Sequence, residues 1–153
     1  MTEIILAKAP GGYLVPVDQE SVEEIAKLKI GQGVRVTMKK MRNVQHHRKF
    51  FALLNLAFDA WEPAVIEFKG EPIKKNFDRF RNDVTVLAGY YEATVNMRGE
   101  VRMVAKSISF GSMDQSEFDK LYSAVIDVIL QRILTNYTRD DLNEVVDRVL
   151  RFT

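Results

Sequence analysis

The feature that most constrains the fold is an apolar stripe in the first half of the chain. Five large side chains recur at intervals of four, three, four and three residues: His47, Phe51, Leu54, Phe58 and Trp61. This spacing places them on one face of an α-helix. Pro63 disfavours helical backbone in the residue before it and therefore ends the segment. The pattern predicts an amphipathic helix from about Asn43 to Trp61 that buries one face.

Shorter signals on either side of this helix indicate a mixed fold. The two glycines at positions 11 and 12 separate apolar runs and predict a β-hairpin, and Asp18 can cap a helix that ends near Leu28. The other predicted elements are a strand at 34–38, a loop at 62–72, a helix at about 73–87, a hairpin at 90–95 and 101–105, and helices at about 114–134 and 138–151. The buried side of the helix at about 73–87 is expected to consist of Ile73, Phe77, Phe80, Val84 and Leu87. The order ββαβααββαα predicts a single α+β domain over residues 1–153, with about five helices and small antiparallel hairpins.

Composition narrows the class of protein further. The 153 residues are 46% hydrophobic and 28% charged, as in an ordinary globular domain. No apolar run approaches the roughly 20 residues that span a bilayer, and the first residues lack a signal-peptide pattern. The absence of cysteine excludes disulfides, zinc–thiolate sites and thiol catalysis. We therefore expect a cytoplasmic protein without a membrane partner. The last helix, about 138–152, is rich in apolar residues, which favours docking on a second subunit.

Charge is distributed unevenly, although the net charge is only +1. Residues 25–58 contain eight basic residues and no acidic one, whereas residues 1–24 contain five acids and one base. Such an acid-free stretch favours an anionic partner. The alternative is a solvated face that the acidic segments neutralise in space.

The acid-free stretch leads into the start of the helix at Asn43. Free backbone N–H groups and the positive end of the helix dipole favour an anion there, and Arg48 and Lys49 lie where the dipole disfavours cations. A bound phosphate would remove that repulsion. We therefore predict a phosphate-contact site made of Lys39, Lys40, Arg42, Asn43, Gln45, Arg48 and Lys49.

A second basic set accompanies the following helix and consists of Lys74, Lys75, Arg79 and Arg81. Phe77 and Phe80 lie between these cations, and their helical spacing favours core packing over base stacking. The cations would then point outward, so that the two helices frame one groove. Arg98 and Arg102 flank a hairpin tip and could extend the basic path.

The sequence predicts no metal, cofactor or catalytic site. The adjacent His46 and His47 point to different helix faces and lack a third ligand. The triplet at 67–69 matches the E-x-K pattern of metal-dependent nucleases, with Asp59 upstream, but such sites need a strand and this triplet falls in a predicted loop. No phosphate-binding loop, nucleophile elbow or dinucleotide fingerprint is present. We therefore expect that the protein is not an enzyme.

Two segments resemble a known family. Residues 42–52 read R-N-V-Q-H-H-R-K-F-F-A and are similar to the segment R-S-L-x-Q-N-R-K-L-W-A of the NinB (Orf) family of lambdoid-phage recombination proteins. Residues 107–121 resemble the S-x-S…M…E-F-x-x-L stretch of that family through Ser107, Ser109, Met113, Glu117, Phe118 and Leu121. The resemblance extends over about a third of the chain and rests on these two short motifs, which occur in a similar order and at a similar separation. Nearly the full length resembles an uncharacterised family of phage and prophage proteins of unknown function.

The NinB resemblance implies an α+β homodimer that binds single-stranded DNA and the host single-strand-binding protein, and that helps to load a recombinase without catalysis. Arg42, Arg48 and Lys49 match the basic positions of the family, and Phe51 matches its aromatic position. His46 and His47 replace the Gln-Asn pair, and a Ser at the helix start is replaced by Asn43, which can still cap the helix.

Three functions follow from these observations. The leading hypothesis is a phage-encoded single-stranded-DNA-binding recombination accessory. The alternative is a protein-interaction module that binds or inhibits a host repair or defence protein through the acidic first segment and the apolar last helix. The third is a metal-dependent nuclease that uses Glu67.

Overall fold

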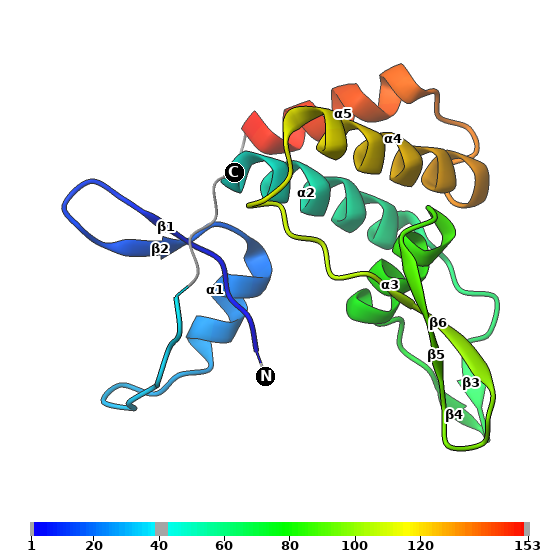
Figure 1. Cartoon of the computed structure of the whole chain (residues 1–153), viewed down its shortest axis with the longest axis horizontal. Coiled ribbons are helices and arrows are strands. Elements are labelled where there is room, and N and C mark those ends of the chain that lie inside the picture. The colour runs from blue at the N-terminus through cyan, green and yellow to red at the C-terminus, as the bar shows by residue number, and fades with distance from the viewer. Residues whose placement is uncertain (1, 39–42, 152–153) are drawn as a thin grey trace.

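The computed structural model describes residues 2–38 and 43–151, which form five helices and three two-stranded antiparallel sheets (Figure 1). In chain order the elements are β1 (Leu6–Lys8), β2 (Leu14–Pro16), α1 (Gln19–Ala26), α2 (Val44–Ala60), β3 (Glu67–Phe68), β4 (Glu71–Pro72), α3 (Phe77–Leu87), β5 (Tyr91–Val95), β6 (Val101–Ala105), α4 (Gln115–Arg132) and α5 (Arg139–Arg151). The predicted α+β class with five helices and small antiparallel hairpins is confirmed.

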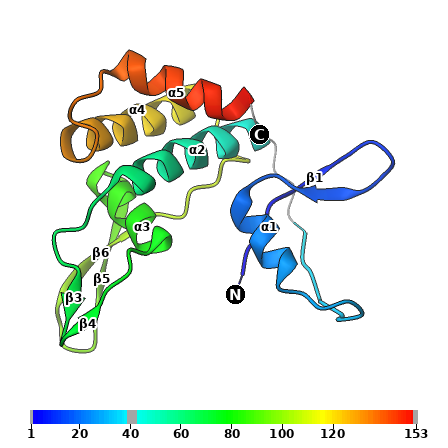
Figure 2. The ribbon, with the colours of Figure 1, turned by 180° about the vertical axis from the view of Figure 1, so that it is seen from behind.

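Helix α2 is the centre of the fold. It contacts α3, α4 and α5, and Figures 1 and 2 show α2, α4 and α5 running alongside one another. His47, Phe51 and Leu54 of the predicted stripe are buried, and Phe58 and Trp61 are half-buried at its end. The buried face is wider than one stripe because three helices cover α2. The core consists of apolar residues from all four helices and the approach to α4, including Phe50, Leu53, Ala57, Phe80, Val84, Phe110, Phe118, Leu121, Val125, Ile129, Leu142 and Val146.

Local capping signals set several helix ends. Asp114 accepts a hydrogen bond from the N–H of Glu117 at 2.8 Å, and the Glu117 carboxylate accepts one from the N–H of Asp114, which forms a complete capping box. Asp18 caps α1 as predicted, by accepting a hydrogen bond from the N–H of Ser21 at 2.7 Å. Asn43 occupies the cap position of α2, but its side chain makes no capping hydrogen bond, contrary to prediction.

Two predicted elements are wrong. Residues 34–38 alternate like a strand but form none, and residues 67–72 of the predicted loop form the hairpin β3–β4. A strand needs a neighbour to satisfy its backbone, and none of the described residues pairs with 34–38. The hairpin closes at Lys69 and Gly70, which both have positive φ, the backbone conformation of the tightest hairpin turns.

The third helix begins later than predicted. Asn76 accepts a hydrogen bond from the N–H of Arg79 and caps α3, so the helix starts at Phe77 and not near Ile73. Phe80 and Val84 are buried as predicted, whereas Ile73 and Leu87 are 44% and 50% exposed.

Part of the apolar face of the C-terminal helix α5 is buried against the rest of the same chain. Leu142 and Val146 of α5 are fully buried, and α5 packs against α2. The expected docking of this helix on a second subunit remains a prediction. Within residues 2–38 and 43–151, no helix is long and apolar enough to cross a membrane.

Candidate nucleic-acid interface

The described part of the acid-free stretch begins as an exposed segment. Residues 28–38 are all exposed and belong to no helix or strand (Figure 2). Lys27, the residue before this segment, pairs with Glu24 of α1. Lys29 and Arg35 form no ion pair with any residue that the structure describes. They are therefore the cations of this segment whose charge is available to a ligand.

Three predicted contacts, Lys39, Lys40 and Arg42, lie outside the described residues. The chain resumes at Asn43, which is half-buried, and Gln45 follows as an exposed residue of α2. Arg48 and Lys49 are half-buried. The Lys49 ammonium nitrogen lies 4.7 Å from the centre of the Tyr122 ring, a cation–π contact between α2 and α4.

The two adjacent histidines are structural residues, each directed to a different neighbour. His47 Nε2 donates a hydrogen bond to Asp18 Oδ2 at 2.7 Å, and its ring stacks on Phe51. His46 Nε2 donates to Gln115 Oε1 at 2.9 Å, and its ring stacks on Phe118 with the planes 4° apart. Both rings are buried, so the two histidines connect α2 to α1 and to α4.

The Asp18–His47 contact shifts the protonation of Asp18. Burial opposes ionisation of the carboxyl, but hydrogen bonds from His47 and from Ser21 outweigh it and hold the pKa of Asp18 below its ordinary value. Asp18 therefore carries a negative charge at neutral pH, beside the start of α2. The position of His47 on an apolar stripe indicated burial, whereas nothing in the sequence signalled its partner 29 residues away.

The second basic set is occupied by contacts within the protein. The Lys75 ammonium donates to the backbone carbonyls of Phe58, Asp59 and Trp61, at 2.6, 3.3 and 3.1 Å. It therefore neutralises the negative C-terminal end of α2, which is a structural role. Lys74, its neighbour, is exposed.

The two arginines of α3 are paired on their own helix. Arg79 lies 3.4 Å from Asp83 and Arg81 lies 3.4 Å from Asp78. Arg81 is also within electrostatic reach of Glu20: burial and Asp78 raise the pKa of Glu20, and Arg81 opposes that shift. Exposed pairs of this kind are weak, but they leave little net positive charge on this face.

Lys49 and Arg81, one from each basic set, do not face a common groove. Arg81 lies over the Phe51 ring of α2, at 5.4 Å, whereas Lys49 lies over Tyr122 of α4. Positions 49 and 51 are about 160° apart around an α-helix. The structure therefore places Lys49 and Arg81 on different sides of α2. The groove framed by the two complete sets remains a prediction, because Lys39, Lys40 and Arg42 lie outside the described residues.

The nuclease triplet does not form a metal centre with its neighbours. Glu67 lies on a strand, as such a site requires, but Lys69 occupies the turn that follows, with φ of 52°. Among the residues that the structure describes, no group of three or more His, Cys, Asp or Glu side chains could hold a metal ion.

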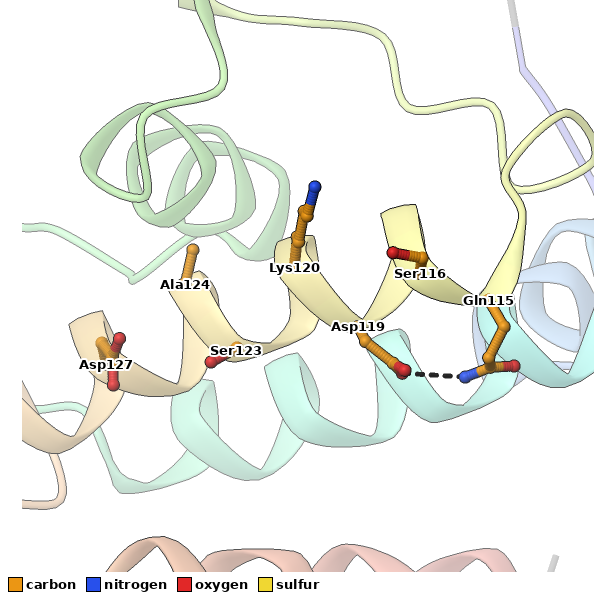
Figure 3. Close-up of a pocket in the computed structure, with 7 residues that line it drawn as sticks. All are labelled: Gln115, Ser116, Asp119, Lys120, Ser123, Ala124 and Asp127. Carbon is orange, nitrogen blue, oxygen red and sulfur yellow. Dashed lines mark hydrogen bonds between the residues drawn. The ribbon is translucent and has the colours of Figure 1, made fainter.

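A shallow hollow follows the outer side of α4 (Figure 3) and is lined by Gln115, Ser116, Asp119, Lys120, Ser123, Ala124 and Asp127. Gln115 donates to Asp119 at 2.8 Å, and Asp127 pairs with Arg139 of α5. Its two carboxylates disfavour a phosphate, so this hollow adds nothing to a nucleic-acid interface.

The sequence of this chain matches a known protein family over most of its length. Residues 1–71 and 66–152 match the family described as "Protein of unknown function (DUF1367)". The chain belongs to the DUF1367 family. The two matches together span nearly the whole chain, which confirms the expected membership of a family of unknown function. No curated protein and no solved structure matches this DUF1367 chain.

Proposed function

We propose that this DUF1367 protein binds single-stranded DNA without catalysing a reaction, as an accessory of recombination encoded by a phage or prophage. The observation that carries the proposal is the acid-free stretch at 25–58, whose segment 28–38 is exposed throughout. Lys29 and Arg35 contact phosphates from this segment. The resemblance to the NinB family supplies the recombination role, the preference for a single strand, and the partners, which are a host single-strand-binding protein and a recombinase in the bacterial cytoplasm.

The proposed interface continues from the exposed segment to the first turns of α2. Lys39, Lys40 and Arg42 join the two parts along the chain, and Gln45 adds an exposed amide that can reach a phosphate. Residues 25–49 contain no aromatic side chain other than the two buried histidines. Because base stacking needs an exposed aromatic ring, binding is mainly electrostatic and tolerant of sequence.

Most of the second basic set is left out of the interface. The three donors of Lys75 are directed at backbone carbonyls, and Arg79 and Arg81 each have a carboxylate partner. Lys74 is the member whose exposed side chain could add a peripheral contact.

The test is fluorescence anisotropy of a labelled single-stranded oligonucleotide at several salt concentrations, with a duplex of the same sequence in parallel. The variant Lys29→Gln/Arg35→Gln removes two exposed cations from a segment outside the helices and strands, so its fold should be unchanged. The matched control Lys120→Gln/Arg132→Gln removes the same charge from exposed positions of α4.

Each phosphate contact on a single strand contributes about 0.7 to the slope of log affinity against log salt. The Lys29→Gln/Arg35→Gln variant should therefore lower that slope by about 1.4, and the α4 control should leave it unchanged. Equal losses in the two variants, or no binding by the parent at about 100 mM salt, would contradict the proposed interface.

A second function, a protein-interaction module, is favoured by one observation. Tyr13 and Leu14 at the tip of the β1–β2 hairpin, in the acidic first segment, are 71% and 53% exposed. Capture of a host repair or defence protein after nuclease treatment, abolished by Tyr13→Ser/Leu14→Ser, would favour this function. Loss of capture on nuclease treatment would favour DNA binding.

A further inference from the structure

The hairpin β5–β6 exposes an apolar face to solvent. Its register pairs Tyr91 with Ala105, Ala93 with Met103 and Val95 with Val101. Side chains alternate along a strand, so these six share one face and none is charged. Val95, Val101 and Met103 are 68%, 72% and 56% exposed. Figures 1 and 2 show the hairpin projecting away from the helices.

The two outer edges of this hairpin differ. The edge of β6 lies against α3, where the N–H of Ala105 donates to Asn82 Oδ1 at 3.0 Å. The edge of β5 has no such neighbour: all five of its residues are exposed, and no hydrogen bond joins its outer side to another residue that the structure describes. The open edge of the hairpin is therefore β5.

The hydrogen-bond pattern identifies which groups this edge presents. The N–H of Asn96 donates to Glu100, and the N–H of Lys106 donates to Tyr90, so the even-numbered residues of β5 face β6. Alternation along an antiparallel ladder then directs the N–H and C=O groups of Tyr91, Ala93 and Val95 outward. The side chains of these three residues also lie on the apolar face.

Strand edges that remain single are usually protected by proline, by charged side chains, above all lysine, by a bulge or by a very short strand. The β5 strand, Tyr-Glu-Ala-Thr-Val, has no proline or lysine, and its register with β6 is continuous. Its one charged residue, Glu92, lies on the face opposite the apolar one. These properties are typical of a strand that has another strand beside it.

We infer that β5 pairs antiparallel with β5 of a second copy of this chain, about a two-fold axis at Ala93. In this register Ala93 lies opposite itself, Tyr91 lies opposite Val95 of the second copy, and Glu92 lies opposite Thr94. The outward backbone groups of all three odd-numbered residues are satisfied, and a four-stranded sheet β6–β5–β5–β6 results. The contact is self-complementary, as a two-fold interface requires.

Charge complementarity favours a second copy in this register. Arg102 lies opposite Thr94 within the hairpin. Glu92 of the second copy is the next residue in the same row. Each of the two rows Arg102–Thr94–Glu92–Val104 therefore carries one cation and one anion, and Arg102 also lies 3.6 Å from Glu100 of its own chain. No like charges lie directly opposite each other, and the smallest side chain of the strand, Ala93, occupies the axis, where it faces its own copy.

The first experiment uses the symmetry of the contact. Because Ala93 faces its own copy, Ala93→Lys and Ala93→Glu each place like charges on the axis, whereas an equal mixture of the two variants pairs opposite charges. Sedimentation velocity should show a parent of twice the 17.6 kDa chain mass, monomers for each variant alone, and a dimer again for the mixture. Met103→Lys, on the same face but on β6, is the control and should remain dimeric.

Each other outcome overturns the inference. A parent that is monomeric at all concentrations removes the interface altogether. Dimeric Ala93→Lys places the interface elsewhere, for instance on α5. Monomeric single variants without recovery in the mixture show that position 93 does not face itself.

A second measurement does not depend on charge. The sequence contains no cysteine, so a single Ala93→Cys substitution gives an unambiguous cross-link. Hydrogen-bonded residues opposite each other have Cα atoms about 5.5 Å apart, which a disulfide can span. Thr94→Cys is the control, because each copy of Thr94 lies opposite Glu92 and is too far from the other Thr94. Rapid oxidation to a covalent dimer is expected for Ala93→Cys alone, and equal rates for both variants would overturn the register.

Discussion

The link between the N-terminal hairpin, α1 and the helical core depends on one carboxylate, and Asp18→Ala tests it. Asp18 accepts hydrogen bonds at 2.7 Å from the N–H of Ser21 and from His47 Nε2. The substitution therefore removes the cap of α1 and at the same time leaves a buried imidazole N–H without a partner.

Each of the two losses lowers the free energy of unfolding by its own amount. Removing a helix cap costs about 1 kcal/mol. Leaving the buried donor of His47 unsatisfied costs about 1–3 kcal/mol more. We therefore expect Asp18→Ala to lower the free energy of unfolding by about 2–4 kcal/mol. Asp114→Ala is the matched control, because Asp114 caps α4 in the same way but is exposed and has no histidine partner; its cost should be about 1 kcal/mol.

Urea denaturation followed by circular dichroism measures both variants, and native-state hydrogen exchange shows whether protection is lost first in α1. A cost for Asp18→Ala no larger than that for Asp114→Ala would refute the reasoning, because the contact with His47 would then contribute nothing.

The same contact predicts a pH dependence. The pKa of Asp18 is lowered from its ordinary value of 3.8 in the folded protein, so its contribution to stability is complete above that value. The contribution is lost as the pH falls through the lower folded value. The stabilities of the parent and Asp18→Ala should therefore differ by a constant amount at neutral pH and should converge below about pH 4.

Three further substitutions test the protein interior and the C-terminal end of α2. Tyr122→Phe should raise the free energy of unfolding by about 1 kcal/mol, because the buried hydroxyl has no hydrogen-bond partner among the described residues. Burial raises the pKa of Tyr122, so the parent should also lose stability above pH 10 relative to this variant, as alkaline urea titrations would show. Lys75→Met should lower the free energy of unfolding, measured by thermal or urea denaturation, by about 1.5–3 kcal/mol. Lys74→Met, at the exposed neighbouring position, should lower it by less than about 0.5 kcal/mol. Equal losses in the two variants would contradict the capping role of Lys75. Leu54→Ala should lower the free energy of unfolding by about 2–5 kcal/mol in the same assay, because Leu54 is fully buried. Val65→Ala, at an exposed position, should lower it by less than about 0.5 kcal/mol.

The helices and their ends could be predicted where the deciding interactions are local. The spacing from His47 to Trp61 identifies α2 to within one residue at each end, and the Asp114–Glu117 pair marks the start of α4. Both signals depend on residues three or four positions apart, so they are present in the sequence itself.

The sequence shows which charged residues belong to the candidate interface, but it does not show which groups each of them contacts. The acid-free stretch is visible in the sequence, and the exposure of Lys29 and Arg35 agrees with a binding role. Lys75 looks equivalent to Lys74 in sequence, but its ammonium is held by carbonyls 14 to 17 residues away. Only the tertiary structure separates the two.

The sequence by itself determined the helical periodicity, the caps of α1 and α4, the hairpin turn between β5 and β6 and the separation of acidic from basic segments, because each follows from near neighbours along the chain. The tertiary structure alone decided that 34–38 has no partner strand among the described residues, that His46 reaches Gln115 across 69 positions, that Lys49 and Arg81 lie on different sides of α2, and that β5 keeps an open edge. These outcomes depend on which distant segments meet, and that is fixed by the packing of three helices around α2.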